Sequence, residues 1–204
     1  QESAGIAVSN GENVTVVKDM GLVSSAFDDR ILAALEGNIA IGHTRYSTTG
    51  SSSWRASQPF YRDVGNLEFA LAHNGNLVNN DELRKHLSEV DRRHLNTESD
   101  TEALLNLFAH ELQENFDGTL SPETIFNAAT QLFDRCSGGY AVVSMILNEG
   151  LVAMRDPNGI RPLILGKREV GQGTEYMIAS ESVALDIADF EIVRDIRPGE
   201  AIYI

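Results

Sequence analysis

The sequence is poor in cysteine, in basic residues and in long apolar runs. Its one cysteine, Cys136, cannot form an internal disulfide, which is typical of a reducing compartment and predicts a cytoplasmic location. Sixteen basic residues stand against 30 acidic ones and give a net charge of −14. That balance argues against a surface that binds nucleic acid or anionic membranes. No apolar run approaches the length that crosses a bilayer, so no membrane association is expected.

Several catalytic and binding signatures are also missing. The sequence contains no G-x-S-x-G nucleophile elbow and no glycine-rich loop of the Walker or dinucleotide-binding type. Its five histidines lack the paired spacing of a metal site, so no metal is expected. Cys136 continues the apolar stripe of an expected helix, and we interpret it as a packing residue instead of a nucleophile.

The hydrophobic pattern divides the chain into three blocks. Up to about residue 76, strand-like runs alternate with one expected helix at 28–35. Helical patterns follow at 81–90, 99–116 and 121–136, the last with Ser121 as cap and Pro122 at its first position. Strand-like runs return after residue 139. Because strands, helices and strands come in blocks, we predict one domain over 1–204 with an α+β fold of mainly antiparallel sheets and outer helices.

An Asn-Gly pair ends the apolar run at 67–73. Asn74 and Gly75 form the strongest local signal for a tight hairpin turn, because both residue types tolerate positive φ. The Asn74 amide and the Gly75 N–H are also two donors that could converge on one developing oxyanion. From this segment alone, both interpretations stay open.

A second polar cluster follows the strand-like run at 38–42. Arg45, Thr48 and Thr49 lie in a segment without apolar periodicity. A guanidinium with neighbouring hydroxyl groups suits a carboxylate, because its fork binds both carboxylate oxygens. The alternative is a surface loop in which Arg45 pairs with an acidic residue, an interaction that contributes little to stability.

A third cluster begins the helical pattern at residue 99. Ser99 and Glu102 predict a capping box, and Asp100 then lies in the first turn, where the helix dipole stabilises a carboxylate. The same carboxylate could accept hydrogen bonds from a ligand ammonium group. Together the three clusters supply a carboxylate clamp, an amine partner and oxyanion donors. That set describes a site for an α-amino acid whose side-chain carbonyl is attacked, but it lacks a nucleophile.

Eight segments of the chain, in order, resemble the glutaminase domains of the amidophosphoribosyltransferases: QESAGIAVS, GHTRYSTTGSS, LAHNGNLVN, NTESDTE, GGYAVVSMI, RDPNGIRPL, IASESVAL and RPGEAIYI. The resemblance covers essentially the whole chain and extends to the class II glutamine amidotransferases, which are N-terminal-nucleophile hydrolases. It implies a four-layer αββα sandwich of two mainly antiparallel sheets, here without its first strand. It also implies glutamine hydrolysis that supplies ammonia for making 5-phosphoribosylamine from phosphoribosyl pyrophosphate in de novo purine synthesis.

The same resemblance implies roles in binding glutamine. Arg45 would hold the α-carboxylate of glutamine with help from Thr48 and Thr49. Asp100 would hold its α-amino group. Tyr46 matches an aromatic residue that is linked to closure of the glutamine site.

Catalysis in the family begins at an N-terminal cysteine whose own α-amine serves as the base. The matching position precedes Gln1, so we expect this chain to lack the nucleophile and to be inactive alone. Asn74 and Gly75 would form the oxyanion hole, which makes the Asn-Gly pair a turn recruited for catalysis. The segment RDPNGIRPL, at 155–163, is interpreted as a β-turn without a catalytic role.

The expected substrate is glutamine, and no cofactor is expected in this domain. Phosphoribosyl pyrophosphate and Mg²⁺ are expected to bind a transferase domain absent from these residues, an iron-sulfur cluster stays open, and a homo-oligomer is the expected assembly. Two alternatives remain. One is the glutaminase domain of another class II enzyme, such as the sugar-phosphate aminating enzyme, which generally has Trp and His where this chain has Tyr46 and Thr49. The other is a glutamine-binding module without catalysis.

Overall fold

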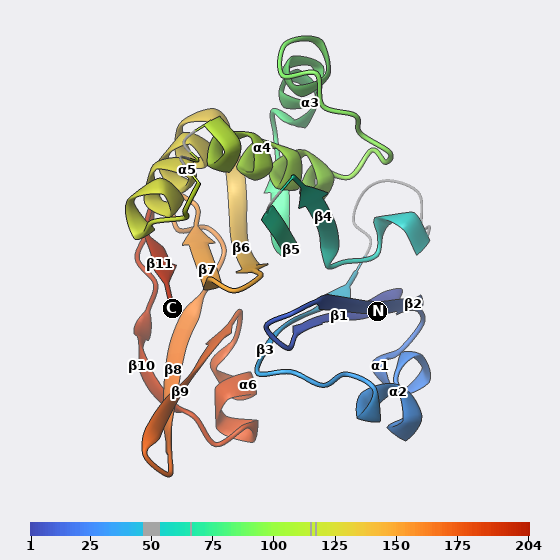
Figure 1. Ribbon diagram of the computed structural model, residues 1–204, viewed down its shortest axis with the longest axis vertical. Helices are drawn as coiled ribbons and strands as arrows, with labels where there is room; N and C mark the ends of the chain where they lie inside the picture. The colour runs from blue at the N-terminus through green and yellow to red at the C-terminus, as the bar shows by residue number, and fades with distance from the viewer. Residues whose placement is uncertain (47–53, 66, 115, 117) are drawn as a thin grey trace.

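The apolar strand segments pair into three antiparallel sheets in the computed structural model, which describes residues 1–46, 54–65, 67–114, 116 and 118–204 (Figure 1). One sheet has the order β2-β1-β3, with β1 at Ser3–Ser9, β2 at Val14–Met20 and β3 at Ile39–Arg45. The five-stranded sheet has the order β11-β7-β6-β5-β4, formed by β4 (Phe60–Val64), β5 (Leu67–Leu77), β6 (Gly138–Ile146), β7 (Gly150–Arg155) and β11 (Ala201–Tyr203). The third has the order β10-β8-β9, formed by β8 (Ile164–Val170), β9 (Gly173–Ala179) and β10 (Glu191–Asp195).

The helices lie outside the sheets. Helices α3 (Asn80–Glu89), α4 (Asp100–Glu114) and α5 (Pro122–Arg135) lie on the side of the five-stranded sheet, and α1 (Val23–Ala26) and α2 (Asp29–Ala33) lie below the first sheet (Figure 1). Helix α6 (Ser182–Ile187) packs on the third sheet, and a short 3₁₀ helix occupies Trp54–Ala56. None of the described helices is long and apolar enough to span a bilayer.

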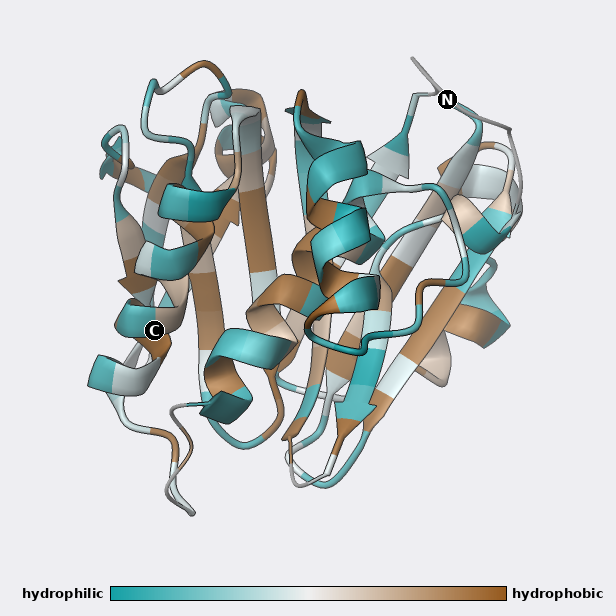
Figure 2. Ribbon diagram, turned by 90° about the horizontal axis from the view of Figure 1, so that it is seen from above, coloured by the Kyte–Doolittle hydropathy of each residue, from teal (hydrophilic) through white to brown (hydrophobic). Residues whose placement is uncertain are grey.

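The alternation of side chains along β5 creates two separate cores. Phe69 and Leu71 face the helices, and the Phe69 ring meets that of Phe108 on α4 edge-on at 5.9 Å between centroids. Ala70 and Ala72 face the other way, into the layer between the sheets. In Figure 2 the strands accordingly carry long hydrophobic stretches, whereas the helices over them alternate between hydrophobic and hydrophilic residues. The apolar first part of β5 is therefore buried on both faces.

Most of the predicted elements are present. Helix α5 begins as predicted, with Ser121 Oγ accepting a hydrogen bond from the backbone of Thr124 at 3.1 Å and Pro122 in the first turn. The helix expected at 28–35 is α2, which Asp28 caps through a 2.7 Å bond from Ile31 N. Strand β4 and helices α1 and α6 were not predicted, because each is too short to establish a periodic pattern.

The predicted fold of mainly antiparallel sheets with outer helices is confirmed. All described strand pairs are antiparallel. The layer under the five-stranded sheet consists of two three-stranded sheets in the described residues, instead of the one sheet that was expected. The arrangement agrees with the four-layer sandwich (Figure 1).

Candidate functional site

The Asn-Gly pair lies within a strand, so the predicted hairpin turn is wrong. Strand β5 runs through Asn74 and Gly75 and stays paired with β6 as far as Leu77, opposite Gly138. Gly75 has a φ of +145°, and a Cβ atom there would lie 2.1 Å from the carbonyl oxygen of Gly139. Glycine is needed here because two backbones approach closely, and the chain does not change direction.

The end of β5 has one edge without a neighbouring strand among the described residues. Strand β4 pairs with β5 only as far as Leu71. Beyond that point, side-chain oxygens accept hydrogen bonds from backbone N–H groups of this edge. Gln58 Oε1 accepts from His73 N at 2.7 Å, and Asp100 Oδ2 accepts from Leu77 N at 3.1 Å. This edge is therefore open to groups other than a strand.

Gly75 lies midway between the two residues that donate to side chains. Along an antiparallel strand, backbone N–H groups alternate between the two edges. The N–H groups of His73 and Leu77 face away from β6, so that of Gly75 faces the same open edge. Gly75 is also exposed. The edge thus presents a backbone donor to an incoming ligand.

Asp100 begins helix α4, as predicted, but the capping box is only half correct. Ser99 Oγ accepts a bond from a backbone N–H of the first turn at 3.3 Å. The Glu102 carboxylate does not return to Ser99 and instead accepts from the backbone of Asn96 (2.7 Å) and Thr97 (2.6 Å). The loop before α4 thus binds the Glu102 carboxylate through its backbone. The other acid of this helical turn, Asp100, contacts β5 instead.

Asp100 is held as a carboxylate next to the Asn-Gly pair. Burial alone would raise the pKa of Asp100, but the His73 ring and the backbone N–H groups of Leu77 and Thr101 outweigh it and lower that pKa. His73 Nδ1 lies 3.6 Å from Asp100 Oδ1 and 3.2 Å from Thr101 Oγ1. Asp100 therefore contacts the residues on both sides of Asn74–Gly75 and places a negative charge there.

Arg45 ends β3 and is mostly buried. Its side chain is 14% exposed, and Nη1 lies 3.6 Å from Glu2 Oε2, so the alternative expectation of an acidic partner is correct, although the pair is not a surface pair. Nη1 is nevertheless buried without a hydrogen-bond acceptor among the described residues. Strand β3 is joined to β5 by a contact of 3.1 Å between His43 Nε2 and His73 O. Arg45 follows that contact by two residues.

The contact between the two strands fixes the state of His43. A carbonyl oxygen only accepts, so Nε2 of His43 must carry the proton. Burial, followed by the charge on His73, lowers the pKa of His43 to about 4. The ring is therefore neutral at neutral pH, and its Nδ1 is buried without a hydrogen-bond partner in the described part of the chain.

The remaining predicted binding residues are not gathered in the same way. Tyr46 is 69% exposed. Thr48 and Thr49 lie outside the described residues. Within those that are described, Arg45 forms no ion pair with Asp100. The structure thus brings Asp100 to Asn74–Gly75 and connects the strand of Arg45 to them through two histidines.

Two residues that sequence reasoning missed contact Asn74. The predicted β-turn in RDPNGIRPL is confirmed by a 2.9 Å bond from Gly159 N to Asp156 O. Beyond this turn, Arg161 Nη2 donates to Asn74 Oδ1 at 2.6 Å, and Asn74 Nδ2 lies 3.4 Å from Ser180 Oγ. Arg161 lies in RDPNGIRPL and Ser180 in IASESVAL, two of the segments that carry the family resemblance. That resemblance gave no reason to expect either residue to contact Asn74.

Cys136 is a packing residue, as predicted. It is 5% exposed at the end of α5 and belongs to the main hydrophobic core. Burial raises the pKa of its thiol to about 12. A thiol of that kind carries almost no thiolate at neutral pH, so Cys136 is not a nucleophile.

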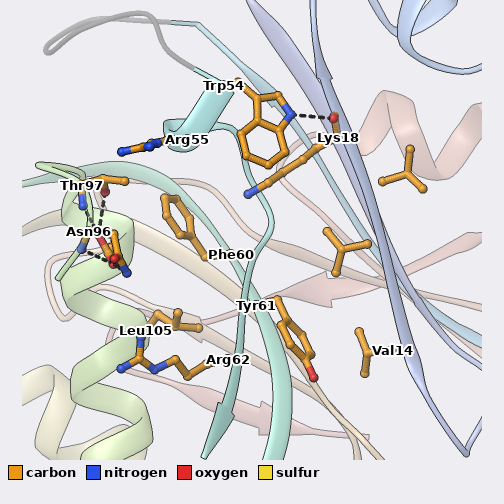
Figure 3. A pocket seen from close by; sticks show the side chains of 13 residues that line it. Val14, Lys18, Trp54, Arg55, Phe60, Tyr61, Arg62, Asn96, Thr97 and Leu105 are labelled. Carbon is orange, nitrogen blue, oxygen red and sulfur yellow. Dashed lines mark hydrogen bonds between the residues drawn. The ribbon is translucent and has the colours of Figure 1, made fainter. Parts of the chain in front are cut away.

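A cavity of about 810 Å³ lies elsewhere, between β2, β4 and the start of α4 (Figure 3). Lys18 enters it, with Nζ 2.8 Å from Ser57 O and 4.9 Å from the centroid of the Phe60 ring. Trp54 lies beside Lys18 (Figure 3). Burial lowers the pKa of Lys18, and the charge of Glu102 opposes that shift. Because the cavity contains none of Arg45, Asn74 and Asp100, we do not assign the predicted chemistry to it.

The chain is similar to known glutamine amidotransferases in both sequence and structure. The family described as "Glutamine amidotransferase domain" matches residues 43–186. The amidophosphoribosyltransferases of Escherichia coli K12 and Pseudomonas aeruginosa PAO1 are 52% and 50% identical, and the matches cover all of this chain but 41% and 40% of those proteins. A solved structure of glutamine phosphoribosylpyrophosphate amidotransferase from B. subtilis, complexed with ADP and GMP, has a TM-score of 0.79 at 34% identity, over 98% of this chain and 40% of that one. This chain thus spans about two fifths of the length of these relatives.

Proposed function

Because the chain belongs to the glutamine amidotransferase domain family, we propose that it forms the glutamine-hydrolysing part of an amidophosphoribosyltransferase. Ammonia released here would pass to a separate transferase domain and displace pyrophosphate from phosphoribosyl pyrophosphate. The product would be 5-phosphoribosylamine, which such an enzyme makes for purine synthesis. Identity of 50–52% over the whole chain to amidophosphoribosyltransferases supports this assignment.

The observation that carries the proposal is the position of Asp100 at the open edge of β5. Its carboxylate accepts from Leu77 N and lies next to His73, so it is anchored on both sides of Asn74–Gly75. A carboxylate anchored to the strand that carries Asn74 and Gly75 suits an amino-acid substrate: the amine would bind the carboxylate while the side-chain carbonyl meets the two donors.

The charges of the site suit a zwitterionic amino acid. Asp100, with its lowered pKa, would accept hydrogen bonds from the α-ammonium group of glutamine. Arg45 Nη1 is buried, with Glu2 Oε2 3.6 Å away but no hydrogen-bond acceptor among the described residues, and a substrate carboxylate would supply one. By resemblance, Thr48 and Thr49 would complete this clamp, and Tyr46 would take part in its closure.

Hydrolysis would proceed through a thioester. Because Cys136 is buried, the attacking thiol would come from residues outside this sequence, as the resemblance implies. As its sulfur bonds to the carboxamide carbon, the carbonyl oxygen gains a negative charge that Asn74 Nδ2 and the Gly75 N–H would stabilise. Collapse breaks the C–N bond, the nitrogen takes a proton and leaves as ammonia, and water then hydrolyses the thioester to glutamate and the free thiol.

For the chain on its own, a glutamine-binding module without turnover is the second candidate. The buried position of Cys136, the one cysteine of the sequence, specifically favours it. The two candidates share the same pocket and differ in whether a nucleophile is supplied.

The test compares two acidic residues in a full-length enzyme that carries this domain. Asp100→Asn removes the proposed ammonium partner, whereas Asp81→Asn removes an exposed carboxylate from the first turn of α3. A hydrogen bond to a charged group contributes about 1.5–3 kcal/mol, so Asp100→Asn should raise the KM for glutamine about 10- to 100-fold. Synthesis of phosphoribosylamine from free ammonia should not change in either variant. Equal loss of both activities in Asp100→Asn would refute the proposal.

A further inference from the structure

The loop after β7 is organised around a buried acid. Asp156 is fully buried, and its carboxylate accepts hydrogen bonds from the backbone N–H groups of Asn158 (3.0 Å), Ile160 (3.1 Å) and Arg161 (3.1 Å). It also accepts from Tyr140 N on β6 at 3.3 Å. One side chain therefore fixes the loop backbone relative to the strand that pairs with β5.

Arg155 holds the same loop from its other side. Its guanidinium donates to three carbonyl oxygens, those of Arg161 (2.7 Å), Ile196 (2.6 Å) and Gly159 (2.9 Å). Gly159 has a φ of +64°, and a Cβ atom there would lie 2.6 Å from Pro198 Cγ. Because Asp156 and Arg155 both bind its backbone, the loop holds the side chain that follows it in a defined position.

That side chain is Arg161, which reaches across 87 residues of sequence to the Asn74 amide. A guanidinium has donors and no acceptor, so a contact of 2.6 Å from Nη2 is possible only with the amide oxygen of Asn74. The orientation of the amide is thereby fixed. Its NH₂ group lies on the opposite side, 3.4 Å from Ser180 Oγ.

The geometry points to Arg161 as a positioning residue for glutamine hydrolysis: it holds the Asn74 amide so that NH₂, and not oxygen, faces the oxyanion. This inference rests on the proposed function. A flipped amide would turn its oxygen toward the developing negative charge and repel it. The positive charge of Arg161 also polarises the amide, which strengthens its N–H groups as donors.

A purely structural explanation fits Arg161 less well. Its Nε is buried without a hydrogen-bond partner among the described residues, and a buried unsatisfied donor costs stability. The loop backbone is already held by Arg155 and Asp156. The side chain of Arg161 therefore contributes the orientation of Asn74 and little to the fold of the loop.

The experiment measures glutamine-dependent and ammonia-dependent synthesis in a full-length enzyme that carries this domain. The variants are Arg161→Met, Arg161→Lys and, as a matched control, Arg30→Met on the exposed surface of α2. Loss of an oxyanion donor typically costs 10²–10³ in kcat, so Arg161→Met should lower the glutamine kcat about 100-fold. The glutamine KM should change less than about threefold, because the oxyanion exists only in the transition state. Arg161→Lys should recover part of the loss, and ammonia-dependent activity should be unchanged.

A double-mutant cycle separates the possible failures. In an Asn74→Ala background, Arg161→Met should have no further effect on kcat, because the group that it orients is gone. If Asn74→Ala lowers the glutamine kcat but Arg161→Met leaves it within threefold of the parent, or if the two losses multiply, the positioning role is refuted and the proposed function stands. If Asn74→Ala leaves glutamine-dependent activity unchanged, the proposed function fails as well. Loss of ammonia-dependent activity in Arg161→Met would show a structural role instead.

Discussion

Gly75→Ala tests whether the close approach of β5 and β6 determines the residue at this position. The added Cβ atom would lie 2.1 Å from Gly139 O and 2.8 Å from Tyr140 Cα. Both are backbone atoms of the paired strand, so no side-chain rotation can relieve the clash. The φ of +145° adds strain for any residue with a Cβ atom.

The expected cost follows from these two effects. Overpacking costs about 1–3 kcal/mol, and a backbone held in a disfavoured conformation costs about 1–3 kcal/mol. The free energy of unfolding should therefore fall by about 2–6 kcal/mol. For a domain of this size, 1 kcal/mol lowers Tm by roughly 2–4 °C. Thermal unfolding followed by circular dichroism should show a decrease of roughly 5–20 °C.

Two glycines provide matched controls in the same assay. Gly171 also has a positive φ, +59°, but nothing lies within 4 Å of an added Cβ atom, so Gly171→Ala measures the conformational cost alone. Gly42 lies in β3, and its nearest neighbour would be 3.7 Å away, so Gly42→Ala should have almost no effect. If Gly75→Ala melts within about 2 °C of Gly171→Ala, the close strand contact does not control this position.

Further predictions concern the thiol, the substrate and pH. Native protein should react with a thiol reagent at pH 8 far more slowly than urea-unfolded protein, because the pKa of Cys136 is about 12; equal rates would contradict its burial. The chain alone should release no ammonia from glutamine, and turnover that Arg45→Ala abolishes would disprove this. Calorimetry with glutamine should give saturable heat, which Arg45→Ala should remove; heat that survives in the variant would place glutamine elsewhere. Because the folded pKa of Asp100 is below its ordinary value of 3.8, the ionised form stabilises the fold. The difference in unfolding free energy between the protein and Asp100→Asn should therefore be constant above about pH 5 and decrease as pH falls through the folded pKa; a difference that grows with acid would show the opposite shift.

The sequence predicted the features that depend on neighbouring residues. Ser121 and Pro122 determine the start of α5 through local hydrogen bonding and a fixed φ, and both act there as expected. The turn at Asp156–Gly159 forms within four residues. Cys136 follows the apolar stripe of its helix into the core. In each case the local preference agrees with the tertiary environment, so the sequence pattern is a sufficient guide.

Predictions failed where a contact from outside the motif outweighs a local preference. Asn74–Gly75 has the composition of a hairpin turn, but a ladder that continues to Leu77 opposite Gly138 keeps the pair extended. Glu102 has the spacing of a capping box, but the N–H groups of Asn96 and Thr97 take its carboxylate. The first competitor is strand β6, which is distant in the sequence, and the second is the loop directly before Ser99, whose path the spacing of Ser99 and Glu102 does not predict.

The failed turn prediction explains how the candidate site is built. A turn would give the Gly75 N–H a direction set by two flexible dihedral angles. A strand fixes that direction through its ladder with β6. It also directs the side chain of Asn74 to one face of the sheet, where the amide contacts Arg161. The two donors therefore reach the site by separate routes, the backbone edge and the side-chain face, and each has its own support. Residues 74, 100 and 161 can act together only when the register of β5 with β6 is correct. The Arg161 contact therefore depends on a pairing that no short stretch of sequence encodes.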